Sequence, residues 1–329
     1  MWSHWLFYAA LKLLRTVFRC MGFLRIRFDR AKQLYHVEQD KWKDFLPYIV
    51  VLVGISAHFL LMLEMADNFR ALQEMQPDLL PPFDIVELVF DMCQDLILAM
   101  LVLNYRIKRN QLWRVISEAQ SCYMQLTRLL KKRFVLRYSK LMVLMVIAQL
   151  LLLLVMCLKI IWFDWPRRDI FCLIDFMLGG VHLLFVLLLT LQFFYHLLHA
   201  ALLQSLNRML KQHRNLKLLH RLLNVQPALQ RVQHLAASYF GILFCCFTAF
   251  LYLKCSAFIG LFTYDEQRFM LDENNPEDEM SRPPTRDELL RVDSLSLVWQ
   301  MALMWQLLCA ALLQQREQKQ LLQGIWKME

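Results

Sequence analysis

The sequence contains apolar runs that are too long and too numerous for the core of a soluble domain. The longest, LMVLMVIAQLLLLLVMCL, occupies positions 141–158 and contains no charged residue. A helix needs about 20 mainly apolar residues to cross roughly 30 Å of hydrocarbon. Six segments meet this requirement and predict membrane-spanning helices at about 45–63, 83–103, 141–163, 170–198, 238–262 and 295–313.

The composition agrees with a membrane protein. Hydrophobic residues make up 58% of the 329 residues, charged residues make up 20%, and the mean hydropathy is +0.37. If this chain folded as a soluble domain, its polar residues would be too few to cover so large an apolar core. Seven glycines are too few for the glycine-rich phosphate loops of nucleotide-binding folds,. The predicted fold is therefore all-α: a polytopic transmembrane helical bundle with six spans.

We divide the chain into an N-terminal region (1–44), a six-span domain (45–313) and a tail (314–329). The apolar segment Trp2–Leu24 contains Lys12, Arg15 and Arg19 at helical spacing. Each cation would cost about 2.5–3.5 kcal/mol at the bilayer centre, and no signal-peptide cleavage site follows the segment. An amphipathic helix in the membrane interface satisfies both of its faces, and a true span is the alternative.

The basic residues are distributed unevenly between the connections. The two terminal regions and the connections after the second and fourth spans hold 28 lysines and arginines, whereas the other three connections hold seven. Basic connections face the cytoplasm. This predicts that both termini are cytoplasmic and that the acidic, proline-containing loop 272–284 is outside. Regular leucine spacing over 197–235 and 112–136 predicts that helices continue into the cytoplasm beyond the spans,.

Other functional classes find little support in the sequence. A net charge of +9 does not indicate nucleic-acid binding, because the basic residues lie between apolar runs rather than on one soluble module,. No cofactor motif, metal-ligand spacing or catalytic signature such as GxSxG, HExxH or Walker A is present,. The pair His196-x-x-His199 cannot complete a di-iron site alone. Cys157 and Cys172 are either buried thiols, the favoured interpretation, or a disulfide. We expect no enzymatic activity, cofactor, metal or nucleic-acid partner.

An acidic stripe is the most informative polar pattern inside the predicted spans. Asp84, Glu87, Asp91 and Asp95 follow one another at i, i+3, i+7 and i+11, and so share one narrow helix face,. Carboxylates facing lipid are expensive, so this face should look into the bundle or a watery cavity. Asp91 and Asp95 are candidates for a ligand or ion pathway. Alternatively, the acids pair with Lys159 or Lys254 and fix helix packing.

Four further residues are candidates for the same pathway. Asp175 and Lys254 fall in the outward halves of the fourth and fifth spans, where a buried pair would relieve the cost of both charges,. His182 lies within the fourth span and Trp299 within the sixth. For both of these residues, ordinary helix packing is the more frequent role.

The order of these features resembles that of insect gustatory receptors and gustatory-receptor-like proteins. The resemblance covers about residues 25–315: a cytoplasmic N-terminal region, basic connections after the second and fourth spans, inward-protruding fourth to sixth helices, and a third outward loop longer than the second. It is a likeness of layout. The family's motif, Thr-Tyr, five apolar residues and Gln-Phe in a seventh span, has no counterpart here, and Thr263-Tyr264 is followed by Asp-Glu-Gln-Arg.

The resemblance implies a cation channel that is gated by a small-molecule tastant. It also implies a tetramer, or another homo- or hetero-oligomer, in the plasma membrane, with a ligand pocket in the outward half of the bundle. A multi-pass transporter or a receptor-like protein without channel activity is the alternative. A G-protein-coupled receptor fits less well, because the Asn104-Tyr105-Arg106 triplet follows the second predicted span instead of the third.

Overall fold

A computed structural model describes most of the chain. The described residues are 26–29, 34–37, 46–75, 83–130, 138–159, 170–212, 224–263 and 286–326, together with Ala9, Lys12, Leu13 and Thr16. Within several of these ranges the structure describes the backbone alone at some positions. Ala9, Lys12, Leu13 and Thr16 are helical, and the Thr16 hydroxyl donates a hydrogen bond to the Lys12 carbonyl oxygen at 2.9 Å.

Long helices dominate the described residues. Their bounds are α2 Leu46–Met75, α3 Phe83–Leu130, α4 Ser139–Lys159, α5 Ile170–Gln212, α7 Gln226–Thr263 and α8 Arg286–Trp326. Each predicted span lies largely within one of these helices. Stretches within α5, α7 and α8 are long and apolar enough to cross a membrane: Phe185–Met209, Gln226–Gly260 and Leu297–Gly324. In α4, the apolar stretch Lys140–Leu151 is shorter. The total of six spans stays a prediction.

A short β-hairpin precedes the long helices, which the all-α prediction did not include. Strand β1 (Ile26–Asp29) pairs antiparallel with β2 (Leu34–Val37), with Ile26 opposite Val37 and Asp29 opposite Leu34. The aromatic and β-branched residues in these strands favour extended backbone. The rest of the described chain is helical, with turn residues at 138 and 224–225.

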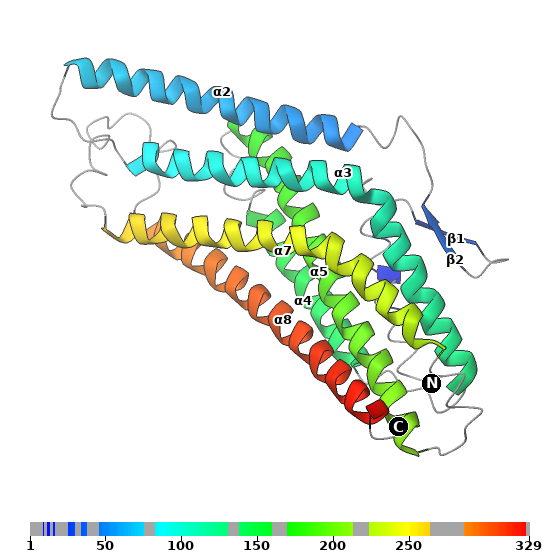
Figure 1. The fold of residues 1–329 in the computed structure, drawn as a ribbon. Helices are drawn as coiled ribbons and strands as arrows, with labels where there is room; N and C mark the ends of the chain where they lie inside the picture. The colour runs from blue at the N-terminus through cyan, green and yellow to red at the C-terminus, as the bar shows by residue number, and fades with distance from the viewer. Residues whose placement is uncertain are drawn as a thin grey trace.

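The helices extend well beyond the predicted spans, as the leucine spacing indicated. Helix α3 continues without interruption to Leu130, and Figure 1 shows that it bends along its length and runs beside α7. Its buried face includes Leu98, Tyr105, Leu112, Ala119 and Leu126, one every seven residues. This repeat keeps one face of a helix against a partner helix, as in a coiled coil.

Helix α5 is the centre of the bundle. In its most apolar stretch 94% of the residues are buried, compared with 22% for α7 and 28% for α8. Its most extensive packing is against α8, and it also contacts α2, α3, α4 and α7. The ring of Phe185 on α5 packs edge-on against Phe247 and Phe250 of α7, with centroids 5.5 and 5.7 Å apart. The other helices therefore surround α5 and separate it from the outside.

The outer surface of the bundle is strongly apolar. Large exposed hydrophobic side chains lie on every helix around α5 and include Leu52, Leu60, Met100, Ile107, Leu144, Leu151, Tyr252, Ile259, Trp305 and Leu312. In water, contiguous apolar surface of this extent is unfavourable. A lipid bilayer solvates these side chains instead, and the helices satisfy their own backbone polar groups there. The surface therefore fits a helical membrane protein.

Candidate functional site

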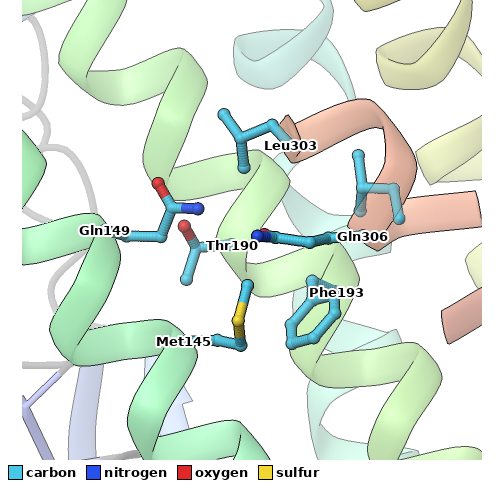
Figure 2. Close-up of a pocket in the computed structure, with 7 residues that line it drawn as sticks. Met145, Gln149, Thr190, Phe193, Leu303 and Gln306 are labelled. Atoms are coloured by element: carbon cyan, nitrogen blue, oxygen red, sulfur yellow. The ribbon is translucent and has the colours of Figure 1, made fainter. Parts of the chain in front are cut away.

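A small cavity lies inside the bundle, where α4, α5 and α8 meet (Figure 2). It is lined by Met145 and Gln149 of α4, Thr190 and Phe193 of α5, and Leu303, Gln306 and Leu307 of α8. The cavity has room for about one water molecule,. Four of the seven lining side chains are apolar, and none of the seven carries a charge.

Three polar side chains line the cavity, two glutamine amides and one threonine hydroxyl. Figure 2 shows the side chains of Gln149, Thr190 and Gln306 converging on one space. The Oε1 atoms of Gln149 and Gln306 are both buried without a hydrogen-bond partner. The Thr190 hydroxyl donates to the Val186 carbonyl oxygen at 2.8 Å, so its own hydrogen is already used. Both Oε1 atoms thus lack a donor in this arrangement, although buried carbonyl oxygens normally have one,.

A second polar feature lies between α5 and α8. We call it the polar seam; it consists of His196, Gln204 and Asn207 of α5 and Gln314 and Glu317 of α8. His196 Nδ1 donates to Gln314 Oε1, and Gln204 Nε2 donates to Glu317 Oε1 at 3.3 Å. Glu317 is buried, with 6% of its surface exposed. These side-chain contacts fix the register of α8 against α5.

Heptad spacing explains why polar residues of α8 are buried. The inward face of this helix consists of Gln300, Leu303, Leu307, Ala310, Gln314, Glu317 and Leu321, separated alternately by three and four residues. The four apolar positions turn this face towards the partner helix, and the polar residues in the same register are buried with them,. Three of the seven positions are polar, so the helix carries its hydrogen-bonding groups into the bundle. The same spacing is visible in the sequence and is the signal that locates the polar seam.

The two histidines of the His196-x-x-His199 pair have different partners. His196 contacts α8, whereas the ring of His199 hydrogen-bonds to the hydroxyl of Tyr195 on its own helix at 3.3 Å. Their arrangement serves helix packing. Over the part of the chain that the structure describes, no group of three or more His, Cys, Asp or Glu side chains is placed to hold a metal ion.

The candidates from the sequence are only partly placed. Asp95 is buried, as the inward-facing stripe requires, and takes part in further interactions. Lys254 is half-buried, and Trp299 is half-buried against the apolar core. None of these three lines the cavity.

The side chains of the other candidates, Asp91, Asp175 and His182, lie outside the described residues. The pairing of Asp175 with Lys254 therefore stays a prediction. The same holds for Cys157 and Cys172. The described cysteines are free thiols: Cys93, Cys122, Cys245, Cys246, Cys255 and Cys309.

Comparison of the sequence with protein-family models and with curated proteins finds no match. The function is therefore inferred from the fold, the apolar outer surface and the buried polar groups.

Proposed function

We propose that this chain is a chemosensory receptor of the plasma membrane, of the insect gustatory receptor type, and a subunit of a ligand-gated cation channel. The observation that supports it most is the cavity between α4, α5 and α8, which is lined by the unpartnered buried oxygens of Gln149 and Gln306. In this proposal the chain has six spans and cytoplasmic termini, and it assembles with other copies or related subunits. The layout of the sequence supports the channel and the subunit assembly.

The packing of α4 suggests how a ligand would act. This helix packs mainly against α5, whereas α5 and α8 share a long interface joined by the polar seam. The cavity has room for about one water molecule, so a tastant that enters must push α4 away from the other two helices. A ligand that binds the separated arrangement better shifts the equilibrium towards it. Movement of α4 would then be the first step of gating.

Electrophysiology tests the proposal. The full chain, alone and with candidate partner subunits, is expressed in oocytes with an epitope tag near Asn275 to measure surface expression. A panel of sugars, amino acids and alkaloids is then applied under voltage clamp. We expect an evoked current that reverses at a cation equilibrium potential. Flux that depends on an ion gradient would identify a transporter instead. A silent protein at the surface in every combination would exclude the channel.

A matched pair of variants tests the role of the cavity. Gln149→Leu removes an acceptor from its wall, whereas Gln192→Leu removes a similar buried, unpartnered acceptor from α5, outside the lining residues. If ligands act through the cavity, the first variant shifts the half-maximal concentration and the second leaves it unchanged. Equal shifts in both variants would place ligand recognition elsewhere.

A further inference from the structure

The two unpartnered oxygens in the cavity lie on helices that share little direct packing. Gln149 belongs to α4 and Gln306 to α8, and the cavity is where the two helices come together. Gln149 is 7% exposed, and its Oε1 atom is buried without a partner, as is Oε1 of Gln306. A buried acceptor that lacks a donor forfeits the hydrogen bond that it made in water. In this arrangement of the side chains, neither oxygen therefore has the donor that it needs.

We infer that the cavity is a binding site for one ordered water molecule, which donates one hydrogen bond to Gln149 Oε1 and one to Gln306 Oε1. Water fits in size, because the cavity holds about one such molecule,. It also fits in hydrogen bonding, because a single water offers two donors to two acceptors. The Thr190 hydroxyl oxygen, which has donated its hydrogen to Val186, faces the same space as a third polar atom.

The water has a mechanical role. It links α4 to α8 at a point where only α5 would otherwise connect them. The water therefore stabilises the arrangement in which α4 packs close to α5 and α8 and the cavity is small. This role deepens the proposed function, since an entering ligand would have to displace the water before α4 could move. The existence of the water site does not depend on channel activity, and its test requires no current.

Radiolytic footprinting tests the inference. X-ray pulses generate hydroxyl radicals from water, and the radicals oxidise the side chains next to it. Met145 lines the cavity, whereas Met142, on the same helix, is buried in the apolar core outside the lining residues. With the full chain in lipid nanodiscs, we expect Met145 to be oxidised several-fold faster than Met142. Equal rates for the two methionines would overturn the inference.

A double-mutant cycle provides a second measurement. If water bridges the two amides, Gln149→Leu or Gln306→Leu alone leaves one hydrogen of the water without an acceptor. Each single variant then lowers the melting temperature by about 2–4 °C. The double variant replaces both acceptors with apolar groups and recovers most of the loss. In a dry cavity, each single variant removes an unsatisfied acceptor. Each would then raise the melting temperature, and the double variant would raise it by the sum of the two. That result would overturn the inference.

Two controls define the site and its occupant. Gln192→Leu, combined with Gln149→Leu, should give an additive change in melting temperature, because Gln192 is not among the lining residues. Replacing Na⁺ and K⁺ in the buffer with N-methyl-D-glucamine should leave the oxidation of Met145 and the melting temperature unchanged. A clear loss of stability in that buffer would show that a cation, held by the same oxygens, occupies the site instead of water.

Discussion

The side-chain amide of Asn207 on α5 donates to Glu317 on α8 twice, to the backbone carbonyl oxygen at 2.9 Å and to the carboxylate Oε2 at 3.3 Å. The residues are 110 positions apart in the sequence. Backbone and side chain of Glu317 are thus held by one amide, so neither a shift nor a rotation of α8 preserves both contacts. Together with the other contacts of the polar seam, this pair fixes how the central helix and the last described helix align.

The first prediction concerns this pair. Asn207→Leu removes both donors and leaves a buried carboxylate with Gln204 as its remaining described donor. We expect a loss of about 1–3 kcal/mol, because hydrogen bonds to charged groups are worth more than neutral ones. Thermal unfolding in nanodiscs measures it. Arg208→Ala, at the exposed neighbouring position, is the control and should unfold as the wild type does. If the Asn207 variant unfolds at the same temperature as the wild type, the contacts between Asn207 and Glu317 are contradicted.

The second prediction compares two aromatic side chains on α7. Phe247 is 1% exposed and packs against Phe185 of the central helix, whereas Tyr252 is 71% exposed on the apolar outer surface. Phe247→Ala should destabilise the bundle by about 3–5 kcal/mol through the cavity that it creates. Tyr252→Ala leaves a gap that lipid fills, so it should cost far less. Surface expression and thermal unfolding distinguish the two variants, and similar effects would argue against the central position of α5.

The third prediction concerns Cys122, on the extension of α3 beyond the predicted span. Burial raises the pKa of this thiol to about 11, and the nearby Glu118 carboxylate contributes. At pH 8 maleimide should therefore leave Cys122 unmodified in the folded protein and label it only after denaturation,. The folded thiol keeps its proton while the unfolded thiol ionises near 9.0, so this contribution to stability is present below pH 9 and is lost as pH rises towards 11,. Rapid labelling of Cys122 at pH 8 would contradict its burial.

The fourth prediction concerns the acidic stripe. If Asp91 and Asp95 serve a ligand or ion pathway, their joint change to Asn should preserve surface expression and abolish the response. If they pair with Lys254 or Lys159 instead, the change strands a buried ammonium and costs about 3–5 kcal/mol. Retention inside the cell would follow, and Lys254→Met should restore expression if Lys254 is the partner. Normal expression together with a normal response would exclude both roles.

The fifth prediction concerns topology. Epitope tags at residue 1, after Lys217 and at Glu329 should be reached by antibody only after permeabilisation, and a tag near Asn275 should be reached on intact cells. The reason is the excess of lysine and arginine in the connections assigned to the cytoplasm,. Labelling of the Glu329 tag on intact cells would require an odd number of spans.

The long helices could be predicted from the sequence because a bilayer imposes a minimum apolar length. Hydropathy alone does not give their ends, since it reports contact with lipid and not helical structure, and the extension of α3 was predicted from leucine spacing over 112–136 instead,. Helix α3 shows the difference: the predicted span ends at about 103, whereas the helix continues to Leu130. Its coiled-coil packing against α7 stabilises the helix there without lipid. The β-hairpin was missed because its strands are only four residues long.

The candidate site was harder to predict. The sequence draws attention to charged residues, because their burial is expensive, and the acidic stripe was found in that way. Gln149 interrupts the most apolar run of the chain, but a neutral amide in a span costs little enough to be overlooked. Its significance depends on Thr190 and Gln306, which the fold alone brings beside it.

The central position of α5 also has a consequence for biogenesis. The ribosome completes this helix before it makes the partner that covers Asn207. At about 5–20 residues per second, the 110 residues between Asn207 and Glu317 take roughly 5–20 s to synthesise. Throughout that interval the polar side of α5 has no α8 to bind and must be shielded by the insertion machinery or an intramembrane chaperone. The chain is therefore most vulnerable to misassembly and quality-control degradation while α7 and α8 are still being translated.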